Sequence, residues 1–278
     1  MKKLLLLLMV GMAALAAPAL AGDLGNPAQL LKQGHSNFGV SGDYLIVQRF
    51  KDLAIERRFS DDGTSFGYKS AQMKEQSKFM ATATYGVRDW LNVFGRFGVV
   101  TGGKYVDHDL KTGSEWQARF QNQFVWATGA KAKVWEKEGG GPGLLLTAQY
   151  LRYDDRKVKE WKNTGDGAGY NAQTFYDIEE KINYYWQTDL VATAYWTCGK
   201  FTPYVGGGIS YNEGRFTGQW ITKGANPVRI DYDANLRSND LVTALLGLDY
   251  NLGRNFLLNM QADFMARNEL SMGLSYNF

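Results

Sequence analysis

The 278-residue sequence has one cysteine, two histidines and five prolines. The lone Cys198 cannot form an internal disulfide, so the fold must hold without one. His35 and His108 do not belong to a cluster with the spacing of zinc ligands, and we expect neither a metal nor a cofactor. After the first 21 residues no stretch approaches 18 consecutive apolar residues, which excludes a transmembrane helix there.

The sequence also lacks a large excess of either positive or negative charge. The chain has 31 Lys and Arg residues against 28 Asp and Glu, and loss of Lys2 and Lys3 with a leader would bring the formal net charge from +3 to +1. This balance gives no reason to expect nucleic acid as a partner. What is plentiful is glycine (32), tyrosine (16) and tryptophan (8), which suit a β-barrel with tight turns and aromatic membrane girdles.

The N-terminus has the pattern of an export signal. Lys2 and Lys3 precede an apolar run from Leu4 to Ala17, and Ala19-Leu20-Ala21 has the small-x-small form of a cleavage site. A membrane-anchoring helix is the alternative, but the run is shorter than the roughly 20 residues of a span and ends at Pro18. We predict a signal peptide over 1–21, a periplasmic N-terminal segment over 22–35 and a barrel over 36–278.

Apolar and polar residues alternate with period two along the rest of the chain, which predicts strands. At the C-terminus, Leu270, Met272, Leu274, Tyr276 and Phe278 share one face, and Glu269, Ser271, Gly273, Ser275 and Asn277 share the other. Such strands need lipid on one side and a polar lumen on the other. Ten are predicted, near 36–48, 70–87, 91–102, 115–135, 144–154, 180–197, 201–215, 237–250, 255–266 and 268–278. The fold class is all-β: a single closed antiparallel transmembrane β-barrel of about 10 strands, with short periplasmic turns and longer extracellular loops.

The connections agree with this topology. Short links fall at 88–90, 137–143, 198–200 and 251–254, and longer polar links at 49–69, 103–114, 155–179 and 216–236, while the link at Arg267 is tight. An even strand number places both chain ends on the periplasmic side. A predicted aromatic girdle at that rim consists of Tyr85, Trp90, Trp135, Trp196, Phe201, Tyr250, Phe256, Tyr276 and Phe278.

Two segments resemble known bacterial barrels. Leu274, Tyr276 and Phe278 resemble the C-terminal signature of Gram-negative outer-membrane barrels, and the strand from Phe201 through Pro203-Tyr204 to Tyr211 resembles one common in OmpA/OmpW/opacity-protein-like barrels. The resemblance implies location in the outer membrane, contact with outer-membrane lipid and lipopolysaccharide, and recognition of the last strand by the barrel-insertion machinery. The chain differs in having about ten strands instead of eight and no peptidoglycan-binding domain after the barrel.

The polar faces define a charged lumen. The site prediction consists of Arg96, Arg119, Lys131, Lys133, Asp189, Asp249 and Asp263, with Asp43, Arg88 and Arg267 also on polar faces. A barrel of eight strands has room inside only for side chains, and a barrel of ten strands is only slightly wider. An ion-pair network, leaky at most to small solutes, is the favoured interior. A porin-like conduit with a basic constriction of Arg96, Arg119, Lys131 and Lys133 is the sharper alternative.

Three other functions compete with a structural or narrow-pore role. An enzyme is possible if Asp107, His108 and Asp109 in an external loop polarise water, but no catalytic residue is assigned and we expect no enzyme. Basic residues beside tryptophans in loops 155–179 and 216–236 suggest lipopolysaccharide or surface binding and adhesion. A soluble periplasmic barrel would expose its apolar rings to water, which disfavours it. We expect a monomeric or weakly associating protein.

Overall fold

The computed structural model describes Ala28 and residues 30–59, 64–109, 115–138, 141–163, 175–223 and 227–278. The predicted signal peptide, 1–21, lies outside these residues. Nothing helical in the described part is long and apolar enough to cross a membrane. The strands are β1 (Ser36–Phe59), β2 (Thr64–Arg88), β3 (Leu91–Asp109), β4 (Glu115–Phe120), β5 (Gln123–Glu136), β6 (Gly143–Asn163), β7 (Phe175–Tyr195), β8 (Phe201–Thr222), β9 (Arg229–Arg237), β10 (Val242–Gly253), β11 (Phe256–Met265) and β12 (Arg267–Asn277).

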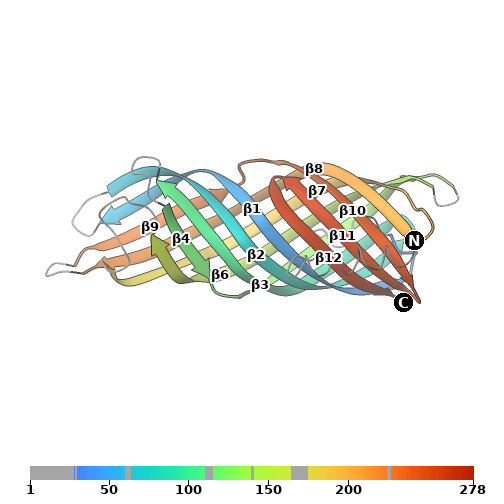
Figure 1. Ribbon diagram of the computed structural model, residues 1–278, viewed down its shortest axis with the longest axis horizontal. Helices are drawn as coiled ribbons and strands as arrows, with labels where there is room; N and C mark the ends of the chain where they lie inside the picture. The colour runs from blue at the N-terminus through green and yellow to red at the C-terminus, as the bar shows by residue number, and fades with distance from the viewer. Residues whose placement is uncertain are drawn as a thin grey trace, which may run out of the picture.

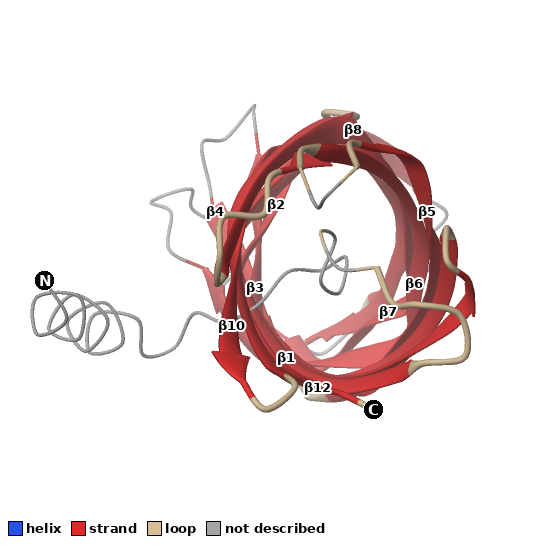
Figure 2. Cartoon of the chain, turned by 90° about the vertical axis from the view of Figure 1, so that its right-hand side faces the viewer, coloured by secondary structure: helices blue, strands red, loops and turns tan. Residues whose placement is uncertain are grey.

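These 12 strands form one antiparallel sheet that closes on itself (Figure 2). β12 pairs with β1, and β10 pairs with both β8 and β11. β4 and β5 both lie between β3 and β6, so they are two halves of one interrupted strand. β9 and β10 both follow β8 in the same way. The barrel therefore has ten strands around its wall, which confirms the predicted fold class.

The short turns lie where they were predicted, at the end of the barrel where the C-terminus lies (Figure 1). The predicted long loops are wrong in extent, because most of 49–69, 103–114, 155–179 and 216–236 is strand. A barrel strand needs only about 9–11 residues to cross the bilayer, whereas β1, β2 and β3 have 24, 25 and 19. The barrel must therefore continue beyond the membrane.

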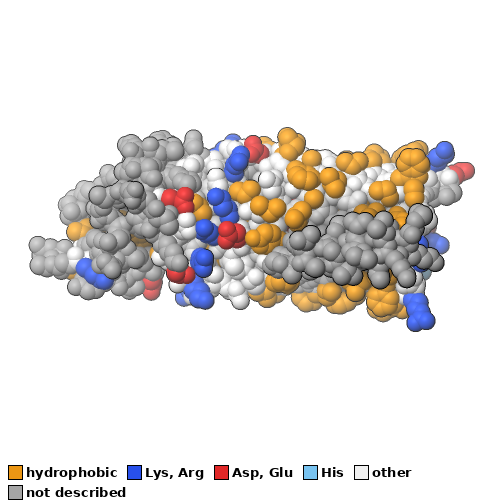
Figure 3. Space-filling view, viewed as in Figure 1, with side chains coloured by type: hydrophobic (Ala, Val, Ile, Leu, Met, Phe, Trp, Pro, Cys, Tyr) orange, Lys and Arg blue, Asp and Glu red, His pale blue; other side chains and the backbone are white. Residues whose placement is uncertain are grey.

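Exposed apolar side chains mark the part that lies in lipid. They gather on the half of the wall nearer the C-terminus, and charged side chains begin beyond them (Figure 3). On this half, Phe38, Val40, Phe79, Phe97, Val205 and Leu246 are 45–61% exposed. The belt ends at Ile46, Val99, Phe124 and Met265. We call this half the membrane section. The extramembrane section comprises β4, β9 and residues 47–59, 64–75, 103–109, 155–163, 175–183 and 212–222.

Aromatic rings border the membrane section on both sides. At the periplasmic rim Trp90, Trp135, Trp196 and Phe278 are more than half exposed, and Tyr276 packs edge-on against Phe256 and Phe278 at 4.9 and 4.8 Å. At the opposite border, Trp126, Tyr150, Trp186 and Tyr211 follow one another with centroid distances of 5.6, 6.2 and 5.3 Å. This second girdle was not predicted. Aromatic belts at both interfaces are typical of transmembrane barrels.

The two sections differ in which face of the sheet is apolar. In β2, Ala71 and Met73 face the interior of the extramembrane section, whereas Lys78 faces the interior of the membrane section and Phe79 faces lipid. All of these apolar residues have odd numbers, so the sequence alternates without a break. The exchange of faces occurs at Glu75, which has φ of 54° and is left out of the pairing with both neighbouring strands, between Lys74 and Gln76. The physical reason is the solvent: lipid requires an apolar outer surface, and water requires an apolar core.

Similar irregularities occur at nearly the same level in the other strands. They lie between Leu45 and Val47, at Gly102–Gly103, at Gln121–Asn122, at Asp155, between Ile182 and Tyr184, and at residues 238–241. A bulge adds one residue and so turns the following side chains to the opposite face. Only β8 passes through without one; there the apolar positions themselves change parity between Tyr211 and Phe216.

The barrel also narrows at this junction. β11 and β12 turn back at Ala266, so they end with the membrane section. Beyond them β1 pairs directly with β9, from Ile55 with Ala234 to Phe59 with Ile230. The extramembrane section is therefore closed by eight strands, a size at which side chains fill the interior.

Candidate functional site: the barrel interior

The interior of the membrane section is organised around Arg267, at the turn between β11 and β12. Its guanidinium lies 3.1 Å from Asp189, 3.5 Å from Glu269 and 4.0 Å from Asp263. Each of these four side chains belongs to a residue no more than 2% exposed. Lys78 adds a second cation, 3.3 Å from Glu269. A buried charge is tolerated only when it is paired and hydrogen-bonded, as these are.

A second group of charges lies on β1, β3, β5 and β10. Arg96 is 3.6 Å from Asp43 and donates hydrogen bonds to Ser41 (3.1 Å) and Thr82 (3.3 Å). The ammonium of Lys131 lies 5.3 Å from the centre of the Phe94 ring. On β10, Asp249 accepts a 2.6 Å hydrogen bond from Asn259. Polar side chains from nearby strands thus bond to one another in the interior.

The predicted lumen residues divide into two groups. Arg96, Lys131, Asp189, Asp249 and Asp263 face inward and are at most 3% exposed. The prediction is wrong for Arg119, whose side chain is 58% exposed and lies 3.9 Å from Glu160. The interruption at Gln121–Asn122 exchanges faces, so period-two counting from Lys131 fails there. Lys133 pairs with Glu136 (2.8 Å) at the partly exposed periplasmic end. The four predicted constriction residues therefore do not form one ring.

Lys78 and Glu269 are members of the network that the prediction omitted. Both stand on the polar face of an alternating segment, next to the lipid-facing residues Phe79 and Leu270. Their positions in the alternating pattern were sufficient to predict that both side chains face the interior. Arg88, which was placed on a polar face, is exposed at a periplasmic turn instead.

The interior of the extramembrane section is aromatic. Phe216 lies 5.1 Å from Tyr105, 6.2 Å from Phe120 and 5.5 Å from Tyr232, measured between ring centroids, and all four residues are at most 5% exposed. Burial raises the pKa of the Tyr105 hydroxyl well above its ordinary value, with Tyr232 and Asp107 adding to the shift. An apolar, closely packed core closes the barrel toward the outside.

Arg156, predicted to lie in an external loop, is a fully buried residue at the junction of the two sections. Its guanidinium donates to the carbonyl oxygens of Gln121 (3.1 Å) and Gly102 (2.5 Å) and to the side chain of Gln76 (2.5 Å). These acceptors belong to strands that are irregular at this level. Burial lowers the pKa of Arg156, and Tyr153 beside it opposes the shift. Arg156 therefore donates hydrogen bonds to acceptors on strands whose regular pairing is interrupted at this level.

Replacement of Arg156 by Met should destabilise the extramembrane section. The buried Gln76 side chain and two part-buried carbonyl oxygens lose their donor, and at about 1–3 kcal/mol for a buried unsatisfied group we expect the free energy of unfolding to fall by about 2 kcal/mol. The measurement is urea unfolding in lipid vesicles. Arg152→Met, which removes an exposed arginine on the same strand, should change the value by less than about 0.5 kcal/mol. Equal midpoints for the two variants would contradict this role.

Of the segment 22–35, which we predicted to be a periplasmic N-terminal segment, Ala28 and residues 30–35 are described, and they lie at the end of the barrel where the short turns are. Ala28 belongs to one buried cluster with the inward-facing residues Leu145, Tyr204 and Leu245. In the amide orientation that satisfies both groups, Asn92 accepts from the Leu31 N–H (2.7 Å) and donates to the Leu31 carbonyl (3.2 Å). Gly34 then bonds to the Gly86 carbonyl at 2.8 Å. This segment covers the periplasmic mouth.

The residues considered for catalysis do not form a described cluster. His108 belongs to strand β3, where its backbone faces Ser70 and Glu115, and its side chain lies outside the described residues. Asp107 is 3% exposed and faces the closed core. His35 is exposed and bonds the Gln33 carbonyl, and Cys198 is exposed at a turn. No group of three potential metal ligands occurs within the described ranges.

No family model matches the sequence, and no curated protein is detectably similar to it. Among solved structures, the outer-membrane protease OmpT from Escherichia coli superposes with a TM-score of 0.53 at 12% identity, covering 91% of this chain and all of OmpT. OprG, an outer-membrane protein of Pseudomonas aeruginosa, gives 0.47 at 11% identity, over 89% of this chain and 97% of OprG. At these identities the likeness concerns the fold alone. With its apolar outer belt, two aromatic girdles and polar interior, the chain has the fold of the outer-membrane β-barrel proteins and belongs in that membrane.

Proposed function

We propose that this protein is a closed structural barrel of the outer membrane, with an extramembrane extension, and not a conduit. The observation that carries the proposal is the burial of the inward-facing polar side chains. Thr147, Asp189 and Ser210, which lie on three successive strands, all have an exposure of 0%. A water-filled lumen would leave such side chains accessible, as in barrels of 16–18 strands.

Three layers support closure along the axis. At the periplasmic mouth Ala28 and Leu31 cover inward-facing side chains. In the middle, Arg267 joins carboxylates from β7, β11 and β12. Beyond the junction the Phe216 cluster contributes packed rings. A solute would have to disrupt each layer in turn.

Planar-bilayer recording tests the proposal. The purified barrel should insert and yet give no discrete conductance steps, because no layer admits water. Insertion is verified separately by flotation of labelled protein with vesicles and by the shift in gel mobility between unheated and heated samples. Uniform steps that change with Arg96→Glu would refute closure and establish the narrow pore with a basic wall. Arg119→Glu is the matched control, since this arginine lies on the outer surface.

A further inference from the structure

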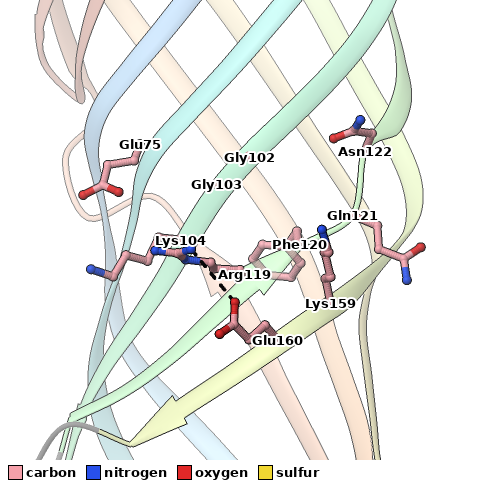
Figure 4. A pocket seen from close by; sticks show the side chains of 10 residues that line it. All are labelled: Glu75, Gly102, Gly103, Lys104, Arg119, Phe120, Gln121, Asn122, Lys159 and Glu160. Carbon is pink, nitrogen blue, oxygen red and sulfur yellow. Dashed lines mark ion pairs between the residues drawn. The ribbon is translucent and has the colours of Figure 1, made fainter.

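The outer wall carries a basic depression at the junction of the two sections. It has a volume of about 790 Å³ and is lined by β2, β3, the β4–β5 interruption and β6 (Figure 4). Lys104, Arg119 and Lys159 contribute cations, and Glu75 and Glu160 contribute carboxylates. Figure 4 shows Lys104, Arg119 and Glu160 side by side along the edge of the depression.

The bulges that exchange the faces of the sheet also produce this depression. Gly102 and Gly103 have φ of 62° and 82°, and Gln121–Asn122 interrupts the neighbouring strand. A Cβ on Gly103 would lie 3.2 Å from Arg156, so the wall is thin there and the buried guanidinium fills the space behind it. The depression is therefore a fixed part of the wall and not a property of a loop.

Basic residues at the depression occupy directly opposite positions on neighbouring strands, where their charges repel. Lys74 is directly opposite Lys104, and Lys104 is directly opposite Arg119. Like charges at directly opposite positions destabilise an antiparallel pair. The three lysines 74, 104 and 159 have no ion pair with any described residue, and Arg119 has only Glu160, at 3.9 Å. Such a row is relieved by an external anion.

Three other basic residues on the outer surface of the extramembrane wall have close acidic partners. Lys181 lies 2.5 Å from Asp155, Arg215 lies 2.5 Å from Asp233, and Arg229 lies 3.0 Å from Asp231. Within the described residues, the depression is lined by Lys104, Arg119 and Lys159 together with Glu75 and Glu160, and Lys74 lies opposite Lys104, which gives a local formal charge of +2. The described side chains at the depression thus carry a local excess of positive charge.

The height of the depression above the lipid identifies the class of anion. Val99 and Phe124, paired across β3 and β5, are 40% and 57% exposed and belong to the apolar belt. Arg119 is five residues farther along the strand direction, which at about 3.3 Å per residue and a tilt near 40° corresponds to roughly 12 Å along the barrel axis. This is the level of the polar headgroups, where phosphorylated glycolipid presents its anions.

We propose that the depression binds phosphate groups of the outer-leaflet glycolipid, lipid A and its inner core. Arg119 supplies a planar donor pair suited to a phosphate, and Lys104 and Lys159 supply point charges beside it. This inference does not depend on whether the lumen is closed. It moves the expected lipopolysaccharide contact from the loops to the wall.

Titration of the detergent-solubilised barrel with bisphosphorylated lipid A, read by native mass spectrometry, tests the site. In the variant Lys104→Gln, Arg119→Gln, Lys159→Gln, affinity should fall at least tenfold. The matched control Arg215→Gln, Arg229→Gln, Arg237→Gln removes the same charge from paired positions on the same section and should lose less than threefold. Circular dichroism and the heat-dependent gel shift establish that both variants are folded.

Two ligand controls make the result decisive. Dephosphorylated lipid A should bind the unaltered barrel no better than bisphosphorylated lipid A binds the first variant, and added salt should weaken the phosphate-dependent part. Inorganic phosphate should compete only weakly, because it lacks the acyl chains that lie against the belt. Equal loss in the two triple variants, or tight binding of the dephosphorylated lipid, would overturn the proposal. Inorganic phosphate binding as tightly as lipid A would overturn the assignment to lipid.

Discussion

Deletion of Glu75 is expected to prevent assembly of the barrel. Without this bulge residue, one half of β2 must present the wrong face. If the extramembrane half keeps its packing, Lys78 turns toward hydrocarbon and Phe79 toward the charged network. A lysine on the lipid face costs about 2–4 kcal/mol at the midplane and about 0–1 kcal/mol near the interface, and Lys78, opposite Val100, lies toward the outer interface. The break of the Lys78–Glu269 pair adds to this cost, so we expect the folded fraction in vesicles to fall more than tenfold.

The matched control is Glu75→Gly, which keeps the number of residues. Because Glu75 has φ of 54°, a conformation that glycine adopts without strain, the substitution should leave stability unchanged or raise it by up to about 1 kcal/mol. Folding is measured by the heat-dependent gel shift and by protection from protease. If the deletion variant folds as well as the control, the bulge is not what sets the orientation of β2.

Replacement of Arg267 by Met should be the most damaging single substitution in the interior. Asp189 and Asp263 lose Arg267 as an ion-pair partner, and Glu269 retains Lys78. Removal of one partner of a buried ion pair costs about 3–5 kcal/mol, because the remaining charge stays buried. We expect a loss of this size in urea unfolding from vesicles.

A second substitution distinguishes charge from packing. Adding Asp189→Asn to Arg267→Met removes one of the stranded carboxylates and should restore a substantial part of the lost stability. Arg229→Met, an exposed arginine in the extramembrane section, should change the unfolding free energy by less than about 0.5 kcal/mol. A loss below about 1 kcal/mol for Arg267→Met would mean that water or rearranged neighbours compensate the carboxylates.

Several interior residues were predictable because each strand has its own uninterrupted alternation. Asp189 stands between Leu190 and Thr188, which face outward, and its inward position follows from parity alone. The prediction for Arg119 was wrong for the opposite reason. The alternation of inward and outward side chains was extended across residues 121–122, where the strand is interrupted. The prediction for Arg156 was wrong because the polar stretch around it was interpreted as a loop. That stretch is a strand whose outer face is polar because it lies in water.

The sequence by itself determined the all-β fold, the number of strands around the wall, the turns at the periplasmic end and the apolar belt, because each depends on local alternation and turn residues. Only the tertiary structure decided where the membrane ends. On seven strands the alternation of apolar residues continues without a break across that boundary, and bulges such as Glu75 and Gly102–Gly103 exchange the faces. An alternation with period two shows that successive side chains point to opposite faces of the sheet, but it does not show which face contacts lipid. Which face is apolar depends on the solvent around the closed barrel.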